Sequence, residues 1–67
     1  MIAIKSLTTD DIGEYVIYRE NSPEMERGRI KSWNDRFIFV VFKCNNEWDR
    51  FKDFTGECVC PEDLTFS

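Results

Sequence analysis

Short β-prone segments separated by polar turns recur along this 67-residue chain. The clearest are Glu14–Arg19, where aromatic and β-branched residues dominate, and Met25–Trp33, where polar and apolar positions alternate. Asn34-Asp35 predicts a tight turn after the second of these segments. Further along, Thr55–Cys60 and Thr65–Phe66 have the composition of short strands. The pattern predicts an all-β chain.

The segment Arg36–Cys44 differs from the others because both of its faces are apolar. It contains six consecutive apolar residues, Phe37–Phe42. A strand with one solvated face alternates apolar and polar positions, so this run predicts a central, strongly curved strand or one whose second face is covered. We expect the cover to be either the aromatic segment Trp48–Phe54 or a second chain.

The remaining segments predict helical turns and an arm. Aromatic residues recur at intervals of three from Trp48 to Phe54, which is typical of a short helical turn, here near residues 47–53. A 3₁₀ turn is expected near residues 61–64, because proline suits the first position of a helix. We expect residues 1–11 to form an N-terminal arm or a short strand.

Together these elements predict a single domain over residues 1–67. The chain has no linker, no internal repeat and no long helix, and short strands joined by polar turns are typical of small closed barrels. Closure would also protect the edges that an open sheet exposes. We therefore expect an all-β, five-stranded barrel.

Composition and charge narrow the class of protein. Aromatic residues make up 15% of the chain and supply the buried area that so small a domain needs. The net charge of −4 disfavours a general binder of the nucleic-acid backbone, which would carry clustered positive charge. We recognise no signal peptide and no apolar run long enough to span a membrane, which predicts a soluble cytoplasmic protein with no membrane partner.

The three cysteines, Cys44, Cys58 and Cys60, favour free thiols in a reducing compartment, because small disulfide frameworks carry an even number. Three thiolates could meet, since the last two would share a strand face, but zinc normally takes four ligands and the chain has no His. The lack of His also removes the commonest general base, and the isolated glycines form no phosphate-binding loop. We therefore predict no metal, no cofactor and no catalytic residue.

Four motifs carry a resemblance to known small proteins: Ile12–Tyr18, Gly28–Trp33, Phe37–Phe42 and Pro61–Leu64. With these motifs the chain resembles small proteins encoded by phages and prophages, and it is more loosely similar to Tudor and KOW-type modules. The resemblance implies an SH3-like barrel with a binding role. It carries over no active site.

A basic stripe is the first candidate site. Alternation places four side chains on one strand face, with Arg36 following in the next segment: Arg27, Arg29, Lys31 and Trp33. Arg and Trp are enriched at the hot spots of protein interfaces, and with a stacking ring the same stripe could hold a single-stranded nucleic acid. The alternative is a solvated face whose cations are balanced by nearby acids.

Three rings are the second candidate site. In Tudor-type barrels, aromatic rings near two of the strand-connecting loops hold cationic ligands, and in this sequence Tyr18 lies at the first such loop and Trp48 and Phe51 lie in the second. Ring faces attract a methylated cation by about 0.5–2 kcal/mol per contact. The alternative is that these rings fill the core of a domain too small to do without them.

The sequence therefore predicts a non-catalytic protein-interaction module of phage or prophage origin. Its expected partner is a host or phage protein, in the host cytoplasm, and a homodimer would be one way to cover the apolar strand. Two other functions stay open. One is a nucleic-acid-binding barrel that uses the basic stripe, and the other is a Tudor-like reader of methylated cations.

Overall fold

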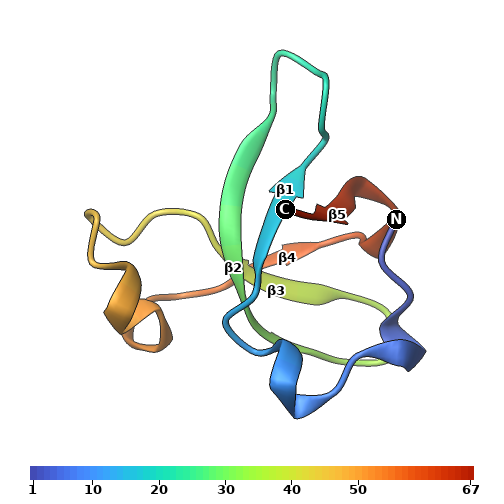
Figure 1. The fold of residues 1–67 in the computed structure, drawn as a ribbon, viewed down its shortest axis with the longest axis horizontal. Coiled ribbons are helices and arrows are strands. Elements are labelled where there is room, and N and C mark those ends of the chain that lie inside the picture. Colours follow the sequence, from blue (N-terminus) through green and yellow to red (C-terminus); the bar gives the residue numbers. More distant parts are fainter.

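Five antiparallel strands form one sheet in the computed structural model, which describes residues 1–67 (Figure 1). Their bounds are β1 (Tyr15–Tyr18), β2 (Glu26–Trp33), β3 (Ile38–Val41), β4 (Glu57–Val59) and β5 (Leu64–Phe66). The sheet order is β4-β3-β2-β1-β5, so the last strand, β5, pairs with the first strand, β1. Each strand overlaps a segment predicted from the sequence, and the all-β class is confirmed.

Four short 3₁₀ helices complete the fold: η1 (Ile4–Ser6), η2 (Thr9–Asp11), η3 (Trp48–Asp53) and η4 (Pro61–Asp63). The turns expected near residues 47–53 and 61–64 are therefore confirmed. Residues 1–11 form an arm with two turns and no strand, and the Thr8 N–H donates to Asp11 Oδ2 at 2.8 Å at the start of η2. None of the helices has the length and apolar character needed to cross a membrane.

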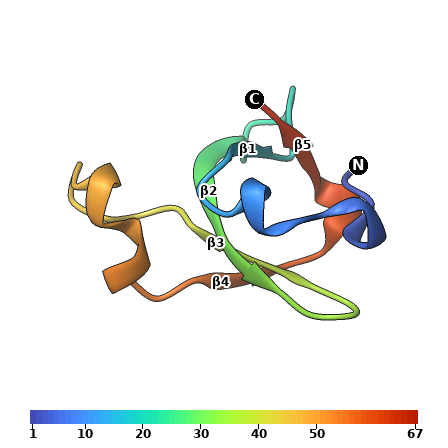
Figure 2. The same cartoon turned by 60° about the horizontal axis from the view of Figure 1, so that its bottom comes forward.

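The main core is a cluster of eight buried side chains to which all five strands contribute. Val59 of β4 and Leu64 of β5 lie on opposite edge strands of the sheet and still belong to this cluster. The sheet must therefore curl around its inner face. Figure 2 shows how β2 does this, as it runs from the side of β1 and β5 to the side of β3 and β4.

A β-bulge changes which side chains of β2 share a face. Ile30 is paired with Val40, but Ser32 is paired with Phe39, so the register shifts by one residue between them. A bulge places one extra residue on its strand, and the alternation of side chains restarts after it. Trp33 is paired with Ile38 and packs against the main core.

A second, smaller cluster buries part of the outer face of β3, where Val41 lies, while Phe39 on the same face stays half-exposed. Val41 and Cys44 pack there with Phe51 of η3, and Trp48 and Phe54 lie against them. The two asparagines that follow Cys44 adopt left-handed φ angles of 53° and 64°, which asparagine tolerates better than most residues. They redirect the chain so that η3 covers β3. Of the two covers expected for the apolar strand, the aromatic turn is the one observed.

Gly28 offers a test of how tightly the inner face is packed. A Cβ atom at this position would lie 2.6 Å from Val40 Cγ1 and 2.7 Å from the Val41 carbonyl oxygen. We expect Gly28→Ala to lower the free energy of unfolding by about 2–3 kcal/mol, measured by urea denaturation with tryptophan fluorescence. Gly56→Ala is the matched control, because its nearest contact, Phe39 Cβ, is at 3.2 Å. Equal losses in the two variants would contradict the packing described.

Candidate interaction site

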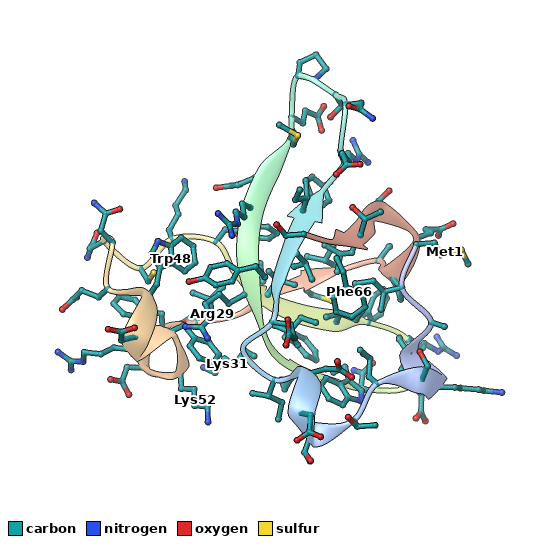
Figure 3. The ribbon with its side chains drawn as sticks, in the orientation of Figure 1. Met1, Arg29, Lys31, Trp48, Lys52 and Phe66 are labelled. Atoms are coloured by element: carbon teal, nitrogen blue, oxygen red, sulfur yellow. The ribbon has the colours of Figure 1, made fainter.

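Cations from β2 and η3 meet aromatic rings on the outer face of the sheet, the face opposite the main core (Figure 3). Tyr15 of β1 is paired directly with Arg29 of β2, and Figure 3 shows Arg29 and Lys31 pointing toward η3. This surface, termed the basic face, consists of four cations and three rings: Arg27, Arg29, Lys31, Lys52, Tyr15, Trp48 and Phe51.

Arg29 is the centre of the basic face. Its Nε donates to the Gly13 carbonyl oxygen at 2.7 Å, and its Nη1 donates to the Trp48 carbonyl oxygen at 2.7 Å. Its Cζ lies 4.3 Å from the centroid of the Phe51 ring and 4.9 Å from that of Tyr15. Two charge-assisted hydrogen bonds and two ring faces thus replace the water around a part-buried guanidinium. Arg29 thereby joins η3 to the segment that precedes β1.

Lys31 holds the other end of η3. Its Nζ donates to the carbonyl oxygen of Phe54, the C-cap residue directly after η3, at 2.6 Å. The last carbonyls of a helix have no partner within the helix, and a lysine near that end can satisfy one of them. Arg29 and Lys31 together therefore fasten both ends of η3 to β2.

Arg27 and Lys52 are exposed and stay available to a partner. Arg27 Cζ lies 4.3 Å from the centroid of the Tyr15 ring, and Lys52 Nζ lies 6.0 Å from that of Phe51. No cation of the basic face has a carboxylate oxygen within 4.0 Å, because every ion pair of the protein involves Arg19 or Arg50. None of these four cations therefore forms a direct ion pair with a carboxylate of the protein.

Two residues of the predicted stripe lie elsewhere. Trp33 was expected beside Lys31, and this placement is wrong, because the bulge returns Trp33 to the core side of the sheet. Arg36 lies in the turn that joins β2 to β3. Arg27 is near the start of β2, so the length of the strand separates the two residues. In that turn the Arg36 N–H donates to Asn34 Oδ1 at 2.8 Å, and its side chain is exposed.

The predicted aromatic cage does not form. Tyr18 packs on Phe42, with ring centroids 6.0 Å apart, beside the main core. Trp48 and Phe51 belong to the smaller cluster on the other face. Trp48 instead meets Tyr15, with ring centroids 6.0 Å apart. A cation does lie among aromatic rings in this protein, but it is the side chain of Arg29.

Arg19 follows Tyr18 and closes the end of β1. Its Cζ lies 5.2 Å from the centroid of the Tyr18 ring, and its Nη1 donates to Glu24 Oε2 at 2.8 Å. Tyr18, then Glu24 and Asp63, favour the charged form of the guanidinium and raise the pKa of Arg19 above its ordinary value. Arg19 is also one of few non-glycine residues here with a left-handed backbone, at φ 47°.

The three cysteines are free thiols in different surroundings. Cys44 is buried in the smaller cluster, whereas Cys58 and Cys60 are exposed. No group of three or more Cys, Asp or Glu side chains is arranged to hold a metal ion. The thiols therefore do not converge as a three-sulfur ligand set would require.

Two residues of the basic face, Tyr15 and Lys52, were not predicted from the sequence. Tyr15 was assigned only to a strand. Successive side chains of a strand point to opposite faces, so Tyr15, which precedes the buried Val16, already belongs on the outer face. Its contact with Arg29 depends on the register between β1 and β2, which no local pattern encodes. Lys52 was hidden within the aromatic turn, where its Nζ lies 6.0 Å from the centroid of the Phe51 ring, the ring that also contacts Arg29.

Comparison with known proteins found no match for this chain: no family model, no curated protein and no solved structure. A functional assignment must therefore rest on the residues of the basic face and on the surfaces around it.

Arg29 is predicted to be the side chain that stabilises η3 most. We expect Arg29→Lys to lower the free energy of unfolding by about 2–3 kcal/mol, because a lysine cannot donate to the Gly13 and Trp48 carbonyls together. Urea denaturation followed by tryptophan fluorescence measures this loss. Arg27→Lys is the matched control, expected to cost under about 0.5 kcal/mol, because Arg27 is exposed and makes no hydrogen bond to a carbonyl. Similar losses in both variants would contradict the role assigned to Arg29.

Proposed function

We propose that the curled sheet is an SH3-like barrel and that the protein is a non-catalytic interaction module of phage or prophage origin. The sheet order and the shared core of the two edge strands support the barrel. The origin is supported by the resemblance of four sequence motifs to small phage proteins. The lack of His supports the non-catalytic role, since the commonest general base is missing.

The basic face is the proposed docking surface, and its partner is an acidic region of another protein. One observation carries this proposal: in a chain of net charge −4, four cations lie on one face and none of them is paired with a carboxylate. The partly exposed rings of Tyr15 and Trp48 adjoin these cations. Arginine and aromatic residues at the centre of a patch are the residues most often found as interface hot spots.

A protein partner is favoured over a nucleic acid by the surroundings of the face. The exposed carboxylates of Glu47, Asp49 and Asp53 lie next in sequence to Trp48 and Lys52 of the face and would repel a phosphate backbone, although Arg50 pairs with the first and the last of them. The ring of Tyr15 already carries Arg27 and Arg29, which leaves less of it for stacking on bases. A folded partner with a few well-placed acids avoids the carboxylates that a continuous polyanion would meet.

A Tudor-like role and a homodimer are less well supported. The guanidinium of Arg29 fills the space between Tyr15 and Phe51 that a cationic ligand would need. A second chain was expected as one possible cover for the outer face of the apolar strand, and η3 already covers that face at Val41. Neither a cationic ligand nor a second chain is needed to account for the placement of the Tyr15 and Phe51 rings or of Val41.

Charge reversal at the two available cations tests the proposal. We expect the double variant R27E/K52E to bind a fluorescein-labelled peptide rich in Asp, Glu and Leu about tenfold more weakly than the unaltered protein at low salt, since two favourable ion pairs become repulsive. Fluorescence anisotropy measures the Kd. The double variant K5E/R36E changes the net charge by the same amount at exposed sites outside the basic face, and it should bind as the unaltered protein does.

Two results would count against this function. Equal weakening by both double variants would show that net charge alone drives binding. Tighter binding to an oligothymidine than to the acidic peptide, lost in R27E/K52E, would support the nucleic-acid function instead. Circular dichroism of each variant confirms that the sheet is retained.

A further inference from the structure

A cleft of about 430 Å³ lies away from the basic face, beside the edge strand β4. Four consecutive residues, Glu57–Cys60, line it. Successive side chains of a strand point to opposite faces, so consecutive residues can border one cleft only where it runs along the edge of the strand. The cleft therefore follows the margin at which β4, paired only with β3, has no neighbouring strand (Figure 2).

The other wall of the cleft is aromatic. Tyr18 and Phe42 line it, and their rings pack edge to face with an interplanar angle of 70°. Tyr18 is the residue predicted to form part of a cage, and it thus borders a real cavity with a different neighbour. An apolar wall beside the unpaired backbone groups of an edge strand is the arrangement by which an exposed sheet edge accepts an added strand.

The charges at the cleft are mainly negative. Three carboxylates line it, those of Glu26, Glu57 and Asp63, against one cation, Arg19. Glu26 and Glu57 have no cationic partner within 4.0 Å, and only Asp63 approaches Arg19, at 3.8 Å. The cleft therefore favours a positively charged occupant, opposite in sign to the partner expected at the basic face.

We propose that this cleft receives an extended basic segment of a partner protein, which adds a sixth strand to the free edge of β4. Backbone groups of the segment pair with β4, its lysine or arginine side chains meet Glu26 and Glu57, and its apolar side chains lie on Tyr18 and Phe42. The site uses none of the residues of the basic face, so it stands or fails independently of the function proposed for that face.

The probe is a fluorescein-labelled, acetylated nonapeptide of alternating Lys and Val, titrated into the full chain and followed by anisotropy. We expect E26Q/E57Q to raise its Kd at least fivefold. The control D10N/D49N removes the same charge from two exposed aspartates outside the cleft, and it should leave the Kd unchanged. A peptide of the same sequence with N-methylated amides at alternate positions should not bind, because it cannot pair with a strand.

The exposed thiols supply a second readout. Cys58 and Cys60 line the cleft, whereas Cys44 is buried and serves as an internal control. We expect saturating peptide to slow alkylation of Cys58 and Cys60 by iodoacetamide severalfold, as followed by mass spectrometry, and to slow hydrogen exchange of the β4 amides.

Three outcomes would overturn the proposal. The first is an unchanged Kd in E26Q/E57Q, and the second is equal binding of the N-methylated peptide, which would reduce the contact to charge attraction. The third is slow alkylation without peptide that accompanies concentration-dependent dimerisation, which would make a second copy of the chain the occupant. None of these results bears on charge reversal at Arg27 and Lys52, so failure here is distinguishable from failure of the basic face.

Discussion

The structure depends on covering the outer face of β3. The inner side chains of this strand join the main core, while Val41 and Cys44 lie on or beyond its outer side and need a second apolar layer. That layer is η3, a helix of only six residues, which could not be stable alone. Its packing through Phe51 and its attachment to β2 must therefore supply its stability, and the small domain gains a second core without a partner chain.

The attachment of η3 also accounts for the candidate site. Arg29 and Lys31 face η3 because β2 presents them on the outer side, and both donate to its carbonyl oxygens. These two cations stabilise the fold, whereas Arg27 and Lys52 at the margin have no such hydrogen bond and remain exposed. The basic face thus stabilises the domain through its inner cations and presents positive charge to solvent through its outer ones. Its interior resists substitution because a lost donor leaves part-buried carbonyls unsatisfied, while its exposed margin can change at little cost in stability.

Local patterns predicted most of the fold and only part of the site. The apolar run Phe37–Phe42 and the aromatic spacing from Trp48 to Phe54 each require a partner surface, and in the structure they meet at Val41. The placement of Trp33 could not be predicted, because the bulge arises from pairing with β3 and not from the residues of β2. Contacts between Tyr15 and Arg29, and between Tyr18 and Phe42, likewise depend on register and curvature.

The attachment of η3 through Arg29 is the central claim, and NMR of the guanidinium observes it directly. If Arg29 Nε–H donates to the Gly13 carbonyl beneath the Phe51 ring, its proton should exchange slowly with water, resonate apart from those of the other arginines and show nuclear Overhauser contacts to Phe51 and Tyr15. An Arg29 Nε–H that exchanges as fast as that of Arg36, with no contact to either ring, would show that η3 is not fastened in this way and would contradict the account.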